Sequence, residues 1–406
     1  MTELSYPSPT PSLACAQSPA RRRALLAGCT AHAIHDGLTD VIYVLLPVWQ
    51  AQFAMSYAQV GLLRGAYSAM MAGFQLLAGR TAARWGRKRL LVGGTALAAL
   101  AYLLVGCAGG LGVLLLALVL GGLGASTQHP LASSLISDAY EPGGGVKQAL
   151  SQYNFAGDIG KTLVPGMVGL LLTVASWRAS VLGVGVLGLA VAAGLWWLIP
   201  ADIATARAKT AKGGAGSGSA SGLRAMILTG TLDSAVRMGF LTFLPFLLQA
   251  KGAGTAGIGL ALTLLFIGGA FGKLLCGYLG ARIGMMKTVW LTESTTAALI
   301  LLALVLPYLG LMAVLPLLGL ALNGTSSVLY GAVPDLAGAG KRDHAFSLFY
   351  TGTIGGGALA PVLFGRLGDL TGIPFAVVAL AALLLLTLPL AWWVQKGLDS
   401  AGGKYQ

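Results

Sequence analysis

The sequence predicts an all-α integral membrane protein, in which twelve transmembrane helices form two six-helix bundles. Composition is the first observation behind this prediction, because 56% of the 406 residues are hydrophobic and only 10% are charged. Soluble domains carry about 25% charged residues. The second observation is the number of long apolar runs, and the third is a repeat that relates the two halves of the chain.

The apolar runs are long enough to cross a bilayer, which takes about 20 helical residues. Residues 1–20 precede them, are rich in Pro and Ser, and are expected to form a disordered cytoplasmic tail. Residues 397–406 are expected to form a second cytoplasmic tail. The twelve runs lie near 24–50, 57–80, 89–108, 111–138, 147–173, 177–199, 223–250, 256–280, 287–307, 311–337, 344–370 and 374–396.

A long polar stretch, residues 200–222, divides the twelve runs six and six. Its Gly and Ser content is typical of a flexible tether. We therefore expect a cytoplasmic linker at 200–222, which joins an N-terminal six-helix bundle at 21–199 to a C-terminal six-helix bundle at 223–396.

The two predicted bundles repeat each other at a nearly constant offset. Moving the second half by 198 residues aligns Gly86 with Gly284, and an offset of 196 residues aligns Pro165 with Pro361. Such an offset is typical of an internal repeat. Secondary transporters built from two repeats place their substrate site between them, near the bilayer midplane.

The net charge of +13 raises the question of a nucleic-acid partner. With the amino terminus in the cytoplasm, most Lys and Arg residues fall in cytoplasmic segments, and only Arg178, Lys251 and Arg366 fall in outer segments. This distribution follows the positive-inside rule and explains the charge without a nucleic acid. It predicts a multi-pass protein of the inner (plasma) membrane with both termini in the cytoplasm.

Several charged residues lie well inside the predicted helices. Each costs about 2.5–3.5 kcal/mol at mid-bilayer, so unpaired they would together cost on the order of 20 kcal/mol. They must therefore face one another or a water-filled cavity. From these charges and the polar helix faces beside them we predict a substrate-binding set: Arg64, Tyr67, Asp158, Lys161, Asp233, Arg237, Lys273 and Asn323.

The first predicted helix has one polar face, on which His35, Asp36 and Asp40 lie within about one turn of each other. Two carboxyl groups one turn apart in low dielectric repel, so at least one should hold a proton near neutral pH. His129 directly precedes a proline, where a kink can admit water. We predict Asp36, Asp40, His35 and His129 as the proton-coupling group. His32, nearer the cytoplasmic side, is expected only to be hydrated.

A structural alternative is open for the other charges. Asp158 and Lys161 have i, i+3 spacing, which permits an ion pair within their own helix. Asp233 and Arg237, with i, i+4 spacing, permit another. Glu293, near a membrane interface, is expected to be structural. In the functional interpretation, four cavity carboxylates balance four cations, so protonating one carboxylate leaves the cavity positive, which suits a small organic anion.

Residues 79–89, "GRTAARWGRKR", resemble the signature loop between helices two and three of the major facilitator superfamily. The family pattern has an Asp where this chain has Ala83, and the second-half copy, "GYLGARIGMMK", has Ala281 at the same place. In the family this Asp helps to latch the cytoplasmic ends of the two halves together. The resemblance implies a cytoplasmic gate at Gly79, Arg84, Gly86, Arg87, Lys88 and Arg282.

A narrower likeness is to the fosmidomycin-resistance-like exporters of that superfamily. It rests on His35-Asp36, on His129-Pro130 and on "QALSQYNFAGDIGKTLVPG", residues 148–166. The nearby "PGMVG" is similar to the end of the fifth-helix antiporter motif. The resemblance implies efflux, proton antiport and drug resistance, with phosphonate-like or drug-like substrates.

These observations predict a proton-coupled secondary active transporter that exports a small organic anion or drug-like compound by alternating access. We expect a monomer without a metal ion or other cofactor, whose partners are its substrate, protons and the lipid bilayer. Proton-coupled uptake of an anionic nutrient is the alternative. A membrane-embedded enzyme with His and Asp as acid and base is a further alternative, but the sequence has no nucleophile motif and no cluster of metal ligands.

Overall fold

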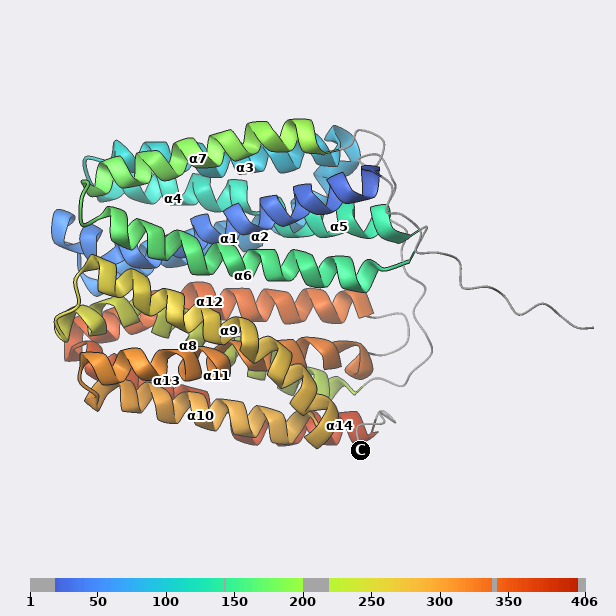
Figure 1. Ribbon diagram of the computed structural model, residues 1–406. Coiled ribbons are helices and arrows are strands. Elements are labelled where there is room, and N and C mark those ends of the chain that lie inside the picture. The colour runs from blue at the N-terminus through green and yellow to red at the C-terminus, as the bar shows by residue number, and fades with distance from the viewer. Residues whose placement is uncertain (1–18, 142–143, 200–218, 338–341, 401–406) are drawn as a thin grey trace, which may run out of the picture.

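The structure is a computed structural model that describes residues 19–141, 144–199, 219–337 and 342–400. Within these ranges the chain forms α-helices and no β-strand, and the helices lie nearly parallel (Figure 1). The first half forms α1 (Pro19–Phe53), α2 (Tyr57–Trp85), α3 (Arg87–Gly106), α4 (Leu111–Ala125), α5 (Gln128–Tyr140), α6 (Val146–Leu171) and α7 (Trp177–Leu198). The second half forms α8 (Ala220–Ala250), α9 (Thr255–Ile283), α10 (Met285–Val305), α11 (Tyr308–Leu336), α12 (Arg342–Thr371), α13 (Ile373–Leu385) and α14 (Thr387–Ser400).

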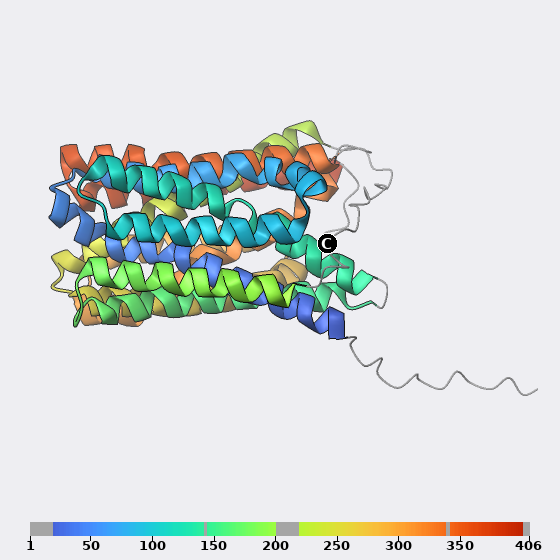
Figure 2. The ribbon, with the colours of Figure 1, turned by 90° about the horizontal axis from the view of Figure 1, so that it is seen from above.

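The two halves of the chain form two adjacent groups of helices. In Figure 1, α1–α7 occupy the upper part of the bundle and α8–α14 the lower part, and the view in Figure 2 shows the helices running along the same axis. The main contacts between the halves join α2 to α12 and α6 to α9. These two helix pairs therefore form the junction across which the halves meet.

The helix bounds reproduce the sequence repeat. α9 begins and ends 198 residues after α2, and α12 begins 196 residues after α6. Gly86 follows α2 and Gly284 follows α9, with φ angles of 85° and 86°. Glycine adopts this backbone conformation without strain, which explains why both copies of the signature loop have glycine there.

Two predicted helices are each split in two. The run near 111–138 forms α4 and α5, which are separated by a turn at Ser126 and Thr127. The run near 374–396 forms α13 and α14, which are separated at Leu386. Each pair still continues in one direction along the bundle, so the split changes the local backbone and leaves the helix order intact.

The predicted linker is shorter in the structure. α8 begins at Ala220 because the Ser219 hydroxyl accepts a hydrogen bond from the Gly222 amide at 3.2 Å, which caps the helix. At the other end, α14 includes 397–400, which were predicted as tail. The remaining linker residues and the outer parts of both predicted tails lie outside the described residues.

Nine helical stretches of the described chain are long and apolar enough to cross a membrane, including every one of the second half. The structure therefore describes a multi-pass membrane protein. The other long helices, α1, α2 and α6, contain charged residues along their length. That these three also cross the membrane stays a prediction.

α1 and α8 lie at the centre of the bundle. In the most apolar stretch of α8, 78% of the residues are buried, against 33% in that of the peripheral α7. In α1, every residue from 34 to 47 is buried. A helix that is buried on all sides has no face in contact with lipid or water. The charges on α1 therefore need partners on neighbouring helices.

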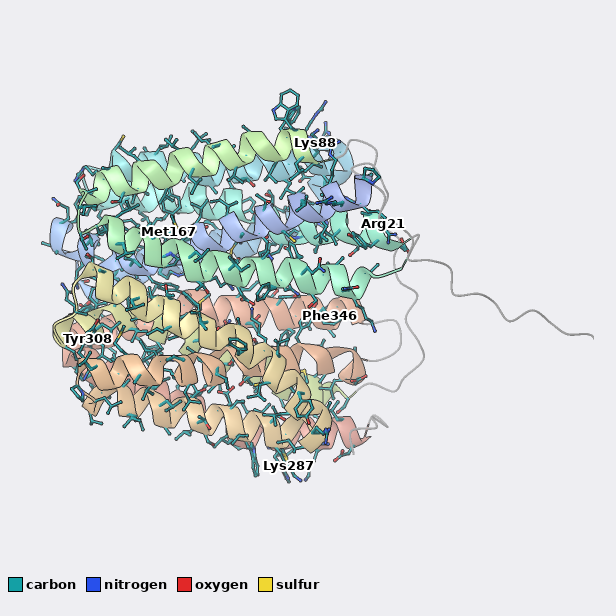
Figure 3. The ribbon with its side chains drawn as sticks, in the orientation of Figure 1. Arg21, Lys88, Met167, Lys287, Tyr308 and Phe346 are labelled. Carbon is teal, nitrogen blue, oxygen red and sulfur yellow. The ribbon has the colours of Figure 1, made fainter. Side chains whose placement is uncertain are left out.

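The two ends of the bundle differ in charge. Arg21, Lys88 and Lys287 lie toward the end at which α1 begins and α14 ends, whereas Tyr308 lies at the opposite end (Figure 3). We call the first the basic end and the second the outer end. Both copies of the signature loop belong to the basic end, because Lys88 is part of the first copy and Lys287 of the second.

Candidate functional site

A cavity of about 1070 Å³ lies between the two halves, which is room for a drug-sized molecule. α2, α5 and α6 line it from the first half, and α11 and α12 from the second. Its lining includes the second turns of α6 and α12, so the cavity lies toward the basic end. The polar side chains in its wall are Gln75, His129, Ser133, Tyr153, Asn154, Tyr330, Ser347, Tyr350 and Thr351.

Direct backbone contacts close the outer end between the two halves. Gly61 of α2 packs against the carbonyl of Pro361 in α12, and Gly169 of α6 packs against Gly259 of α9. In both places a Cβ atom would overlap the facing backbone. The two halves are therefore in direct contact at the outer end, whereas the cavity lies toward the basic end.

Asp369, near the end of α12, adds a polar contact to this closure. Its carboxylate accepts hydrogen bonds from the amides of Tyr57 at 2.7 Å and Ala58 at 3.0 Å, the first residues of α2. The first amides of a helix have no partner within it, so a carboxylate there satisfies them and interacts favourably with the helix dipole. Because α2 and α12 belong to different halves, this contact, the Asp369 clasp, also ties the halves together.

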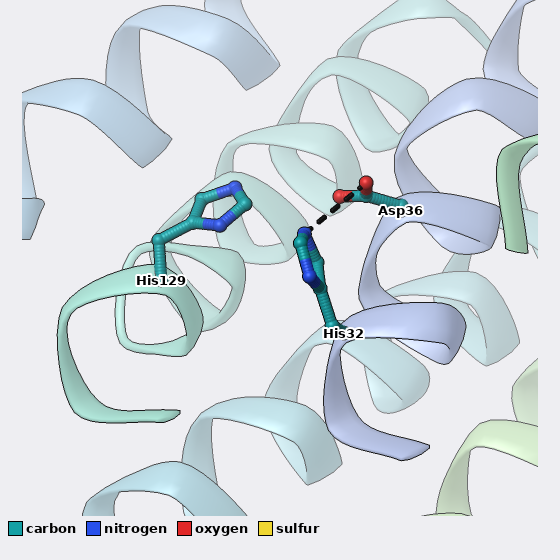
Figure 4. Close-up of side chains that lie close together, drawn as sticks. All are labelled: His32, Asp36 and His129. Atoms are coloured by element: carbon teal, nitrogen blue, oxygen red, sulfur yellow. Dashed lines mark ion pairs between the residues drawn. The ribbon is translucent and has the colours of Figure 1, made fainter. Parts of the chain in front are cut away.

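Asp36 on α1 is the centre of the polar group in the first half (Figure 4). Its Oδ2 lies 3.3 Å from Nε2 of His32 and 3.2 Å from Nζ of Lys161. Its Oδ1 lies 3.8 Å from Nε2 of His35. All three α1 side chains are buried, so little water screens these contacts. The structure thus brings Asp36 and His35 together and supplies a cation from α6.

The prediction that His32 is only hydrated is wrong. Its ring stacks on Tyr153 with centroids 4.1 Å apart, and its Nδ1–H donates to the Tyr153 carbonyl at 2.8 Å. A carbonyl oxygen only accepts, so Nδ1 carries the hydrogen and Nε2 of the neutral ring presents a lone pair to Asp36. That contact is favourable when a proton lies between the two atoms. His32 is therefore in direct contact with Asp36.

His129 on α5 connects this group to the cavity. Its side chain lines the cavity, and its ring centroid lies 5.1 Å from that of His32 and 4.7 Å from that of His35. Three imidazoles in contact can pass a proton from the cavity to Asp36. The ligand atoms of His32, Asp36 and His129 lie within 4.8 Å of one another, a spacing that a metal ion could bridge. The Lys161 ammonium on the same carboxylate opposes such a cation.

Gly157 on α6 is the position that lets this group form. A Cβ atom there would lie 2.7 Å from Oδ2 of Asp36 and 2.7 Å from Nε2 of His32. Real Cβ atoms essentially never make contacts this short, so a larger residue would push the two groups aside. The close approach of α6 to α1, which also delivers Lys161, therefore depends on glycine at this position.

Asp40 and Arg64 form a second pair, deeper in the first half. Their closest atoms, Oδ1 and a guanidinium nitrogen, are 4.0 Å apart, and Arg64 is 1% exposed. Arg64 also donates to the Ser68 hydroxyl at 2.6 Å and lies 4.7 Å from the ring centre of Tyr43. Tyr67 is fully buried beside it. The structure therefore places Arg64 and Tyr67 behind the cavity wall, away from its surface.

Asp158 and Lys161 do not pair with each other, so the within-helix alternative is wrong for them. Lys161 contacts Asp36 on α1, and Asp158 accepts a hydrogen bond from Lys273 on α9 at 2.5 Å. The second pair joins the two halves, because α6 and α9 belong to different halves. The side chains of Lys161 and Lys273 are 30% and 36% exposed. Neither is among the residues that line the cavity, but both are far more accessible than Arg64.

Asp233 and Arg237 lie on α8 in the second half. The Asp233 carboxyl is within hydrogen-bonding reach of Glu293 on α10. Glu293 is 1% exposed, because α10 turns this residue into the bundle. Arg237, one turn along α8 from Asp233, lies within electrostatic range of both carboxyl groups, and its Nε has no hydrogen-bond partner among the described residues.

Asn323 lies away from the cavity wall. Its Nδ2 donates to the Gly319 carbonyl of α11 at 3.2 Å, and its side chain packs against Gly269 of α9. The predicted set also omitted several residues that do line the cavity, namely Tyr153, Ser347, Tyr350 and Thr351. The last three have i, i+3 and i+4 spacing, a polar helix face that could have identified them.

The signature-loop residues contact their own halves. Arg87 forms an ion pair with Asp138 of α5, and the Lys88 ammonium lies 4.9 Å from a ring centre of Trp196 in α7. Arg282 stacks over a tyrosine of its own helix. Each of these three contacts stays within one half.

A bundle of two helical repeats with a polar cavity between them defines a membrane transporter. A profile of the Major Facilitator Superfamily matches residues 28–230 and again residues 226–402. The chain therefore belongs to the Major Facilitator Superfamily. It is a transporter of small molecules and not an enzyme.

Among curated proteins, the chain is similar to the cephamycin export protein CmcT of Amycolatopsis lactamdurans, with 30% identity over 159 residues. This match covers 39% of the chain and spans only 33% of the length of that relative.

Among solved structures, the chain is similar to a bacterial homologue of the human lysosomal transporter Spinster, in an inward-facing and occupied conformation. The TM-score is 0.77 at 17% identity, over 95% of this chain and 98% of that one. It is also similar to a mutant of the nucleoside transporter NupG, with a TM-score of 0.72 at 14% identity, over 93% and 99% of the two chains. Identities this low support the shared fold alone.

Proposed function

We propose that this chain is a proton-coupled transporter that exports a small organic anion by alternating access. The observation that carries the proposal is the position of Asp36, which contacts both the titratable ring of His32 and the ammonium of Lys161. One carboxylate thus links a proton carrier to a cation. We assign the basic end to the cytoplasm by the positive-inside rule, which makes this the state open toward the cytoplasm.

The proton enters from the cavity at His129 and reaches Asp36 through His32 or His35. An ionised Asp36 holds Lys161, whereas a protonated Asp36 attracts the ammonium far less. Lys161 is then available to another anion. By thermodynamic reciprocity, an anion on Lys161 makes proton binding at Asp36 more favourable to the same extent.

Lys161 and Lys273 are the cations best suited to bind the substrate. Both are partly exposed, and each is held by a carboxylate, Asp36 or Asp158. A substrate carboxylate or phosphonate replaces that partner, so no bare cation is left in low dielectric. Because Asp158 and Lys273 join α6 to α9, an anion that takes Lys273 also loosens a contact between the halves. The tyrosine rings of the cavity suit the organic part of the substrate.

Export is the proposed direction because of the similarity to the cephamycin export protein. A carrier that binds an anion and a proton together works reversibly, and here the outward gradient of the substrate drives export. Uptake of an anionic nutrient is the second candidate, favoured by the double contact on Asp36. When proton and anion bind together, an inward proton gradient drives uptake of the anion. Antiport would instead require the proton and the substrate to compete.

The test has two steps on the purified, full-length protein. A thermal-shift screen against small organic anions at two pH values first identifies a ligand, since a ligand that binds the native state stabilises it. Co-binding predicts that the anion binds more tightly at the lower pH, whereas antiport predicts weaker binding. Flux is then measured in proteoliposomes with and without a pH gradient. An anion flux that is the same with and without the pH gradient would overturn the proposed proton coupling.

A further inference from the structure

Asp233 and Glu293 form a buried pair of carboxyl groups that the proposed cycle does not use. Asp233 is 4% exposed and Glu293 is 1% exposed. The two groups, on α8 and α10, lie within hydrogen-bonding reach of each other. Two ionised carboxylates in contact repel strongly where water is excluded.

The surroundings of this pair supply too little positive charge for two carboxylates. In the described part of the chain, the titratable groups within electrostatic range of the pair are Arg237 on α8 and Cys276 on α9. Cys276 is a buried free thiol and adds no positive charge. From α11, the Thr325 hydroxyl lies beside Glu293 and donates to Thr292 at 2.7 Å. One guanidinium therefore balances one carboxylate and leaves the other uncompensated.

An unpartnered oxygen gives a second, independent observation. Oε1 of Glu293 has no hydrogen-bond partner among the described residues, although it is fully shielded from water. A buried oxygen without a partner is most costly on a charged carboxylate. A protonated carboxyl avoids that cost and can also donate a hydrogen bond to its neighbour. Charge and hydrogen bonding therefore both require a proton at this place.

We propose that Asp233 and Glu293 bind one proton between them, as a proton site of the second half that is separate from the Asp36 group. The carboxylic acid of one residue donates to the carboxylate of the other, as in other paired acids. Arg237 balances the single remaining charge. The place of this proton in the transport cycle rests on the proposed proton coupling, but its presence does not.

The test is infrared spectroscopy of the full-length protein in lipid bilayers at neutral pH, in the carbonyl-stretch region of protonated carboxylic acids. Glu293→Gln is expected to remove the intensity of one carboxylic acid. Asp233→Asn is expected to remove it as well, because the remaining Glu293 can ionise beside Arg237. Glu141→Gln is the matched control, because Glu141 is exposed and should leave the region unchanged.

A Glu293→Gln spectrum equal to that of the wild type would overturn the shared proton. Persistence of the band in Asp233→Asn would also overturn it, because Glu293 would then hold its proton without a partner. If Glu293→Gln does not fold, the Asp233→Asn spectrum still decides the question. If the wild-type protein shows the carboxylic-acid band but no proton-driven transport, that result would count against the proposed function. It would not contradict the shared proton of Asp233 and Glu293.

Discussion

The polar centres of the two halves differ, although the helices that carry them repeat each other. The 198-residue offset places Asp233 of α8 against His35 of α1, and Arg237 against Thr39. The first half joins its carboxylates to several cations and reaches the cavity through His129. The second half encloses two carboxyl groups with one cation. The two halves thus share helix bounds and glycine turns but differ in the charged residues at their centres.

The largest expected effect comes from breaking the centre of the first half. Asp36→Asn should abolish substrate accumulation driven by a pH gradient in proteoliposomes, because an amide cannot exchange a proton with His32. The fold should largely persist, since Asn resembles the protonated acid. Asp399→Asn, at an exposed position, is the control and should transport at the wild-type rate. Accumulation that persists in Asp36→Asn would move the coupling to the second half.

A second prediction compares the cations of the two halves. Lys161→Gln should weaken anion binding by about 1.5–3 kcal/mol, the scale of a charged hydrogen bond. Arg237→Gln should weaken it less, because Arg237 lies within electrostatic range of the carboxyl pair of its own half. Affinities measured by calorimetry with the anion found by thermal shift would check this order. If Lys161→Gln binds the anion as tightly as the wild type and only its melting temperature is lower, the role of Lys161 is structural.

A smaller effect is expected from tightening the space around Asp36. Gly157→Ala should destabilise the protein by about 1–3 kcal/mol through overpacking. It should also slow pH-driven transport, because it displaces the contact with His32. Gly183→Ala is the matched control, since a Cβ atom there meets nothing within 4 Å. A Gly157→Ala protein with wild-type melting temperature and flux would show that this packing is loose.

The smallest predicted effect concerns the Asp369 clasp. Asp369→Ala should cost about 0.5–2 kcal/mol, the range for losing a helix cap, and should favour the state that is open at the outer end. Labelling of single cysteines placed at that end should become faster. Gln59→Ala is the control, because Gln59 caps the same helix from within the first half. Equal labelling in the two variants would mean that the clasp does not hold the halves together.

Much of the fold could be predicted, because hydropathy and internal repeats indicate where the helices begin and end. The offsets seen between Gly86 and Gly284 and between Pro165 and Pro361 in the sequence return as matching helix bounds. The sequence predicted a kink beside Pro130, but it did not predict that a turn at Ser126 and Thr127 divides α4 from α5. The start of α8 was missed because the Ser219 cap lies inside a Gly/Ser-rich stretch.

Much less of the site could be predicted, because partners depend on how helices are rotated against each other. Asp36 and Lys161 were each recognised, but their contact requires α6 to approach α1 at Gly157, which no spacing along one helix reveals. From its position along α1, His32 was expected only to be hydrated. Depth along a helix does not determine which neighbours a side chain meets, and His32 is buried.

The glycine contacts at the outer end offer a way to trap the transporter for structure determination. Because Gly61 meets the Pro361 carbonyl directly, a single methyl group at residue 61 acts as a wedge between α2 and α12. Such a wedge should leave the cavity wall and its charges untouched while making the closed outer end sterically inaccessible. A variant of this kind would give crystallographers and electron microscopists a homogeneous population of the opposite conformation without an inhibitor or a bound antibody fragment.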